Sequence, residues 1–165
     1  MERVPMTPIG QEKLQRELHQ LKHVERMQNV RDIEEARAHG DLSENAEYHA
    51  AKERQGMIDG QIKHLEDQLS RAEVINPANI KSEKVVFGAT VEVLDLDEDK
   101  ELTYTIVGSP EADSKLGRIS VYSPIARSLI GKVEGDEVEV PTPRGRRTLE
   151  LLSIRYEALE PVEGD

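Results

Sequence analysis

The sequence predicts an α+β protein in which an antiparallel coiled-coil helical hairpin precedes an antiparallel β-sheet domain with a short helix. In residues 1–75, apolar side chains repeat at spacings of three and four, which is typical of amphipathic helices. In residues 76–165, short runs of β-branched residues alternate with turn residues, and this part holds four of the five aromatic residues. The change of composition near Asn76-Pro77 predicts a linker over residues 76–81.

The first helix is predicted to begin at Thr7-Pro8, where a capping hydroxyl is followed by proline at the first helical position. The apolar stripe that follows consists of Leu14, Leu18 and Leu21 and then, with drift, Val24, Met27, Val30 and Ile33. A drifting stripe still packs against a partner helix, although less regularly than a strict seam does.

The second helix carries a cleaner seam with one polar interruption. Its members are Tyr48, Ala51, Gln55, Ile58, Ile62, Leu65, Leu69 and Ala72. Between the two stripes, Gly40 suits the left-handed position that ends a helix. Asp41 can cap the next helix, and Glu44 can complete a capping box.

So short a break between two long helices predicts an antiparallel hairpin over residues 1–75 with its tip near residues 39–45. Each arm has about 30 residues, so the hairpin is roughly 45 Å long. A two-helix hairpin encloses no core, and we therefore expect it to act at its tip or along its length.

Residues 82–157 are predicted to form a compact β-rich domain. The expected strands are residues 90–94, 102–107, 118–122, 137–140 and 148–156. A serine cap, a proline at the first position and a closing glycine predict a short helix over residues 123–131. Residues 158–165 are expected to form a frayed tail.

Composition and charge exclude several classes of protein. The formal net charge of −11 argues against a general DNA-coating protein, because phosphate binding needs a net basic face. An aromatic content of 3% argues against a base-stacking platform for single strands. The chain has no cysteine, which suits a reducing compartment, and no apolar run approaches membrane-spanning length. We expect a cytoplasmic protein with no membrane partner.

The candidate tip gathers two carboxylates, Asp41 and Glu44, and two interpretations compete for them. Capping and dipole matching satisfy this spacing fully, and spacing alone favours that interpretation. The alternative is a hard-cation site, because carboxylate oxygens are the ligands that Mg²⁺ takes, with positions left for water and phosphate. Placement at the end of a rod favours this alternative, since a rod can carry the pair into a cleft.

Basic residues also lie near the predicted tip. Arg37 precedes the turn and Lys52 lies on the returning helix, so an antiparallel hairpin could place them side by side. They could hold a phosphate backbone, or they could be solvated cations paired with neighbouring carboxylates. A further basic cluster, Arg144, Arg146 and Arg147, is predicted to be a solubilising hairpin turn.

Four motifs stand in an order that is known from one family of proteins. They are the runs Pro5–Leu14, Glu35–Glu53, Val86–Val91 and Ser123–Gly131. Together they resemble the N-terminal opening, the tip, the first C-terminal strand and the C-terminal signature of the bacterial GreA-type transcript cleavage factors of the Gre family. The resemblance covers residues 5–156.

The resemblance implies a coiled-coil hairpin and an FKBP-like C-terminal domain that docks on RNA polymerase beside its secondary channel. The hairpin tip would enter that channel and stimulate the polymerase's own cleavage of the nascent RNA 3′ end after backtracking. The nuclease centre would belong to the polymerase, so the factor is expected to be neither an enzyme nor the holder of a cofactor of its own. We expect a monomer.

The resemblance also implies roles for particular residues. Asp41 and Glu44 would complete the polymerase active centre as shared ligands of Mg²⁺. Arg37 and Lys52 occupy the positions of a basic patch that contacts the extruded RNA, with lysine where arginine is common. Pro124, Ile125, Leu129 and Ile130 could line a docking surface for polymerase. Because Ile125 and Leu129 are assigned mainly to the core of a short amphipathic helix, Ser123, Pro124 and Arg127 are the better candidates for contact.

Three other functions remain open at this point. A homologue that enters the same channel could inhibit the polymerase, although the intact Asp41 and Glu44 disfavour this. The FKBP-like half could be a prolyl isomerase or chaperone, although its few aromatic residues are scattered. The hairpin could be a scaffold without a catalytic role, although a Gly-Asp break argues for pairing of its own arms.

Overall fold

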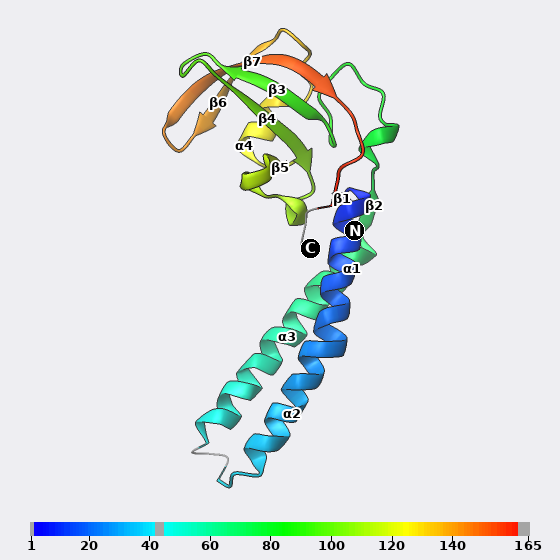
Figure 1. Cartoon of the computed structure of the whole chain (residues 1–165), viewed down its shortest axis with the longest axis vertical. Coiled ribbons are helices and arrows are strands. Elements are labelled where there is room, and N and C mark those ends of the chain that lie inside the picture. Colours follow the sequence, from blue (N-terminus) through cyan, green and yellow to red (C-terminus); the bar gives the residue numbers. More distant parts are fainter. Residues whose placement is uncertain (1, 42–44, 162–165) are drawn as a thin grey trace. The chain divides into compact units, whose positions relative to one another are not determined.

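The computed structural model describes residues 2–41 and 45–161 and has the predicted α+β fold (Figure 1). The described chain divides into two compact units. The hairpin unit comprises residues 12–71, and the globular unit comprises residues 2–11 together with residues from 72 onward. Residues 2–11, which the sequence analysis placed with the hairpin, therefore group with the β-rich part. None of the helices in the described ranges is both long and apolar enough for a membrane crossing.

The first arm of the hairpin is an unbroken helical run made of three segments. They are α1 (Pro8–Gln20), a π-helical segment (Leu21–Glu25) and α2 (Arg26–Arg37). A π-helical turn contains more residues than an α-helical one and so rotates every later residue around the axis. Val24, Met27 and Val30 are consequently exposed by 49%, 51% and 39%. Their predicted place in the seam is wrong, because uniform α-helical spacing was assumed.

A polar residue occupies the seam position that the shift creates. Asn29 is buried, and its Nδ2 donates a hydrogen bond of 2.9 Å to the carbonyl oxygen of Ala51 on the other arm. A single buried asparagine fixes the register of paired helices, because any slip leaves its amide without a partner. The arms of this hairpin are therefore held in one alignment.

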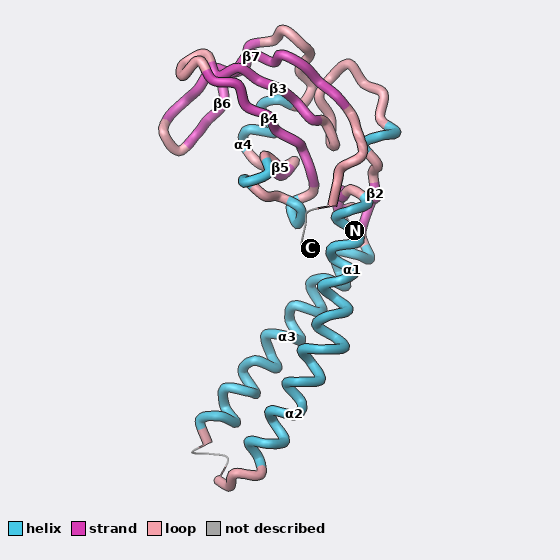
Figure 2. Tube along the Cα trace, viewed as in Figure 1, coloured by secondary structure: helices cyan, strands magenta, loops and turns pink. Residues whose placement is uncertain are grey.

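The second arm, α3 (Ala46–Ser70), confirms the predicted seam as far as Leu69 and runs beside the first arm (Figure 2). The last predicted seam residue, Ala72, lies instead in a short strand after the helix. Ile58, Ile62 and Leu65 are buried, and Tyr48, Ala51, Gln55 and Leu69 are half-buried. Ion pairs also join the arms, among them Arg26 to Asp59 at 3.2 Å. Since both of these side chains are largely exposed, the pair stabilises the hairpin only slightly.

The globular unit contains a five-stranded sheet in the order β5-β4-β3-β7-β6. The strands are β3 (Thr90–Asp95), β4 (Lys100–Val107), β5 (Arg118–Ser120), β6 (Glu137–Thr142) and β7 (Gly145–Arg155). All neighbours are antiparallel except β4 and β5. The sheet curls around the short helix α4 (Pro124–Leu129), as Figure 1 shows. The strands and the helix match the predicted ranges to within a few residues.

The core of the globular unit lies between the concave face of the sheet and α4. Its fully buried members include Val85, Val91, Val93, Ile106, Leu129, Val140 and Leu151. The strand β3 alternates buried and half-buried positions, as expected for a strand with one face on the core. A register shift between Glu92 and Val93 opposite β7 increases the local bend of the sheet.

Both ends of the hairpin sequence connect through a small parallel pair of strands in the globular unit. β1 (Val4–Met6) pairs with β2 (Ala72–Val74), and the Ile75 N–H donates to the Met6 carbonyl at 2.8 Å. The C-terminal residues of the described chain are also anchored, because Arg118 donates to the Glu160 carbonyl at 2.8 Å. A frayed tail was expected over residues 158–165; within its described part this hydrogen bond ties Glu160 to β5, and residues 162–165 lie outside the described residues.

Candidate functional site at the hairpin tip

The turn between the two arms is built by Gly40 and Asn45. Gly40 has a φ of 113°, the left-handed conformation predicted for it. Asn45 is the N-cap of α3, because its Oδ1 accepts from the Tyr48 N–H at 3.1 Å. Its Nδ2 donates to the Ala36 carbonyl near the end of α2 at 2.6 Å. The Asn45 side chain therefore caps the start of the second arm and also satisfies a backbone carbonyl near the end of the first.

The predicted capping role of Asp41 is wrong, since α3 begins at Ala46 and Asn45 caps it. Asparagine fits this position better, because its amide both accepts and donates whereas an ionised carboxylate only accepts. Asp41 lies instead in the non-helical segment directly after Gly40, and it is exposed. Glu44 falls outside the described residues, so its predicted pairing with Asp41 stays a prediction.

Within residues 2–41 and 45–161, no three or more histidine, aspartate or glutamate side chains are grouped so that they could hold a metal ion. A carboxylate such as that of Asp41 is nevertheless a suitable ligand for a hard cation such as Mg²⁺.

Arg37 is the last residue of α2, and it is exposed. Its guanidinium carbon lies 6.0 Å from the centroid of the Tyr48 ring, at the limit of a cation–π contact. A cation at a helix C-terminus also interacts favourably with the helix dipole. Arg37 is therefore held beside the turn with its charge open to solvent.

Lys52 is exposed on α3 and donates to Gln55 Oε1 at 2.8 Å. The bond from Asn45 to Ala36 aligns the turn with the end of α2, whereas the bond from Asn29 to Ala51 aligns Lys52 with the middle of α2. At 1.5 Å per residue, the backbones of Arg37 and Lys52 are about 12 Å apart along the hairpin. The Arg37 guanidinium nevertheless lies near the Tyr48 ring, one helical turn before Lys52. That the two cations lie side by side therefore stays a prediction.

Acidic residues that the sequence analysis did not single out line an open hollow between α2 and α3. Its walls are Asp32, Glu35, Ala36, Glu47, Ala50, Ala51 and Arg54. Three carboxylates against one guanidinium make this face of the hairpin attract cations and repel phosphates. Only the alignment of the two arms reveals it, since its residues come from both helices.

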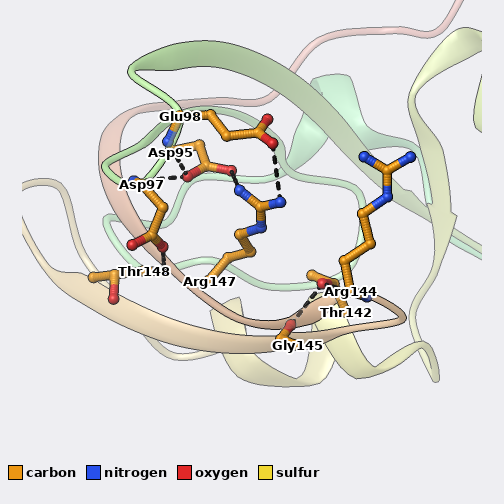
Figure 3. Close-up of polar contacts among 8 residues, drawn as sticks. All are labelled: Asp95, Asp97, Glu98, Thr142, Arg144, Gly145, Arg147 and Thr148. Carbon is orange, nitrogen blue, oxygen red and sulfur yellow. Dashed lines mark hydrogen bonds and ion pairs between the residues drawn. The ribbon is translucent and has the colours of Figure 1, made fainter.

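The three arginines at and after the β6–β7 turn have different surroundings (Figure 3). Arg147 lies 2.9 Å from Glu98 Oε1 and 3.8 Å from Asp95 Oδ2, and its side chain is only 21% exposed. Arg146 pairs with Glu139 at 3.2 Å, and the Arg144 side chain points away from the group in Figure 3. The predicted solubilising turn therefore describes Arg144, whereas Arg147 joins β7 to the end of β3 and to the turn after it.

Ser123, Pro124 and Arg127, the predicted docking residues, surround the start of α4. Ser123 is its N-cap, with Oγ accepting from the Ala126 N–H at 3.3 Å, and Pro124 and Arg127 are exposed. The assignment of Leu129 and Ile125 to the core is confirmed, since Leu129 is fully buried and Ile125 packs against the core.

Two apolar side chains near α4 are exposed, and the sequence analysis named Ile130 but missed Tyr122. Tyr122 is 61% exposed directly before the helix, and Ile130 is 37% exposed directly after it. Exposed apolar area of this kind favours a contact with another protein. Nothing in the sequence distinguishes Tyr122 from its less exposed neighbours.

Two models of known families match the chain. "Transcription elongation factor, N-terminal" matches residues 4–74, and "Transcription elongation factor, GreA/GreB, C-term" matches residues 80–156. Transcription elongation factor GreA of Hyphomonas neptunium is 57% identical over 94% of this chain and 99% of that protein. The factor of the same name from Rhodospirillum rubrum is 56% identical over the same shares.

Among solved structures, GreA factor homolog 1 (Gfh1) of Thermus thermophilus is 26% identical over 93% of this chain and 99% of that chain, with a TM-score of 0.44. The family assignment rests on the two family models and the curated relatives. The chain belongs to the GreA/GreB family of transcription elongation factors. This assignment does not favour an isomerase, a scaffold or an inhibitory homologue.

Proposed function

We propose that the protein rescues stalled transcription by stimulating RNA polymerase to cleave the 3′ end of backtracked nascent RNA. The hairpin tip would enter the secondary channel of the polymerase, and the polymerase would supply the nuclease centre. The observation that carries this proposal is the place of Asp41, which is exposed directly after Gly40 in the segment that joins the two arms of the hairpin. The cytoplasm is the expected compartment for this activity.

The chain's own contribution to the chemistry would be carboxylate oxygens. Asp41 and Glu44 would complete the ligand set of a second Mg²⁺ in the polymerase active centre and orient the attacking water. A bound Mg²⁺ polarises the phosphate and lowers the pKa of the water that attacks it. The acidic hollow behind the tip adds to the negative potential and favours the approach of the cation.

Arg37 and Lys52 would act on the RNA rather than on the metal. Arg37 offers a planar fork of donors that suits a phosphate, whereas Lys52 offers a point charge. Because their backbones lie about 12 Å apart along the hairpin, they would contact different phosphates of the extruded strand. The acidic hollow would keep the strand from lying across the face between α2 and α3.

The start of α4 would form part of the docking surface for polymerase. The exposed Pro124 and Arg127 and the exposed ring of Tyr122 offer apolar area and one cation. Ser123 would act by fixing the first turn of α4, since its hydroxyl caps that helix. Docking through the globular unit would leave the hairpin tip available for the channel.

The test is a cleavage assay on a backtracked elongation complex with saturating factor. Asp41→Ala and Glu44→Ala are expected to lower the stimulated rate roughly 100-fold, because a metal ligand contributes several kcal/mol. Glu53→Ala removes an exposed carboxylate from α3 and serves as the matched control. Unchanged cleavage with both tip variants would refute the proposed role of the carboxylates.

A further inference from the structure

Thr7 joins β1 to α1, and it is fully buried in the globular unit. Its carbonyl accepts from the Gln11 N–H at 3.0 Å, and its hydroxyl oxygen accepts from the Gly10 N–H at 3.3 Å. These bonds make Thr7 the cap of the first turn of α1. The hydroxyl proton of Thr7 is therefore directed away from the helix.

A carboxylate from a distant segment accepts a hydrogen bond from that hydroxyl. Glu111 is 7% exposed and lies 104 residues away from Thr7 in the chain. Its Oε2 accepts from the Thr7 N–H at 3.0 Å and from the Gly108 N–H at 3.1 Å, and its Oε1 accepts from the Thr7 hydroxyl. All three partners donate, and a negative charge at a helix N-terminus is favoured by the helix dipole.

The space around this carboxylate also restricts two neighbouring residues. A Cβ on Gly10 would overlap the carboxyl group of Glu111, and a Cβ on Gly108 would lie 3.0 Å from Glu111 Oε2 and collide with the Pro5 carbonyl. Gly108 has a φ of −69°, so it is required for space and not for a left-handed conformation. We call Thr7, Gly10, Gly108 and Glu111 the α1 socket; all four belong to the globular unit.

We propose that the α1 socket sets the direction in which the hairpin leaves the globular unit, and that Glu111 is a positioning residue for transcript cleavage. The first turn of α1 is fixed by the socket, and the helical run continues from there without a break to Arg37 at the end of α2. A helix is stiff over this length, so the orientation of its first turn determines the position of its far end. The consequence for cleavage rests on the function proposed above, whereas the consequence for orientation does not.

The length of the arm makes this orientation important. The run from Pro8 to Arg37 is roughly 45 Å long, so a rotation of about 5° at the socket moves the tip by about 4 Å. A misplacement of about 1 Å at a reacting centre costs on the order of 100-fold in rate. Loosening the socket should therefore lower cleavage without changing the tip or the docking surface.

The direct test measures the distance between the two units. Because the chain has no cysteine, Glu53→Cys on α3 and Glu101→Cys on β4 introduce two specific spin-label sites at exposed positions. Pulsed electron resonance then gives the distribution of distances between the labels in the full-length protein. With an intact socket we expect a narrow distribution.

Gly10→Ala is the decisive variant, because alanine favours the helix while its methyl group displaces the Glu111 carboxylate. Thr7→Val removes only the hydroxyl, and Thr7→Ser keeps it. Gly60→Ala is the matched control, since a Cβ at Gly60 has nothing within 4 Å. We expect a clearly broader distribution for Gly10→Ala and Thr7→Val and an unchanged one for Thr7→Ser and Gly60→Ala. Circular dichroism checks that each variant is folded.

Two results would overturn the proposal. One is a distribution for Gly10→Ala and Thr7→Val as narrow as that of Gly60→Ala. The other is a distribution that is already broad with the socket intact. In the cleavage assay, Gly10→Ala should lower the maximal rate roughly tenfold or more while the half-saturating concentration stays within about twofold. Loss of activity in Asp41→Ala tests the proposed function separately, and no outcome there alters the measured distances.

Discussion

The two units differ in the way that they exclude water. The globular unit closes a sheet around α4, and many of its core side chains are 0 or 1% exposed. The hairpin unit has a single seam whose most buried apolar residues include Ile58 and Ile62, while Met27 and Met57 are 51% and 62% exposed. The comparison indicates that the globular unit tolerates little change in its interior, whereas the hairpin depends on register and on its caps.

The largest effect should follow from a cavity in the globular core. Leu151 is 1% exposed on the central part of β7, and Leu151→Ala should destabilise this unit by about 2–5 kcal/mol. Met27→Ala on the hairpin should cost about 0.5 kcal/mol or less, because its side chain is half in water. Denaturant unfolding of both variants measures the difference. Equal losses would contradict the contrast between the two units.

A smaller effect is expected from the buried polar residue of the hairpin. Asn29→Ala removes the bond to the Ala51 carbonyl and leaves a gap, so the hairpin should lose about 1–2 kcal/mol. Hydrogen exchange of α2 and α3 amides should accelerate accordingly, and that of the β3 and β7 amides should not. If the exchange rates of the hairpin did not change, the seam would not depend on this residue for its alignment.

Substitution of a hairpin glycine should stabilise the protein. Gly60 lies within α3 and has open space around its missing Cβ, so Gly60→Ala should add about 0.5–1 kcal/mol. Gly10→Ala should have the opposite sign despite the same gain in helix propensity, because its methyl group meets Glu111. Thermal unfolding of the two variants compares the signs directly. A gain in both would show that the α1 socket accommodates a methyl group.

The smallest effect concerns alkaline pH and the globular unit alone. Burial of Tyr104, with a lesser contribution from the charge of Asp95, raises the pKa of its hydroxyl above the ordinary value. The folded state therefore holds this proton more tightly, so the contribution is present below the unfolded pKa and is lost as the pH rises through the folded pKa. Tyr104→Phe should make the loss of stability above about pH 10 less steep. Identical slopes with and without the hydroxyl would contradict this assignment.

The regular parts of this molecule were predictable because each follows from a local rule. The left-handed Gly40, the cap at Ser123 and the seam from Ile58 to Leu65 can each be recognised within a few neighbouring residues. The strands of the sheet follow from alternation and turn residues in the same way. The assignment of Leu129 to the core likewise needs only the spacing of a short helix.

The errors arose where one segment determines the structure of another. The π-helical segment moves Val24 and Met27 out of the seam, and no local sequence pattern predicts such a segment. Asn45 is a better cap than Asp41 because Ala36, on the other arm, needs a donor. The α1 socket joins residues 104 positions apart, so only the fold reveals it.

The most direct test of the proposed mechanism is the dependence of cleavage on magnesium concentration in a backtracked elongation complex. If the tip supplies metal ligands, Asp41→Asn should need a higher Mg²⁺ concentration for half-maximal cleavage, and excess Mg²⁺ should partly restore its rate. If the unsubstituted protein and Asp41→Asn give the same cleavage rate at every Mg²⁺ concentration, Asp41 does not contribute to holding the ion.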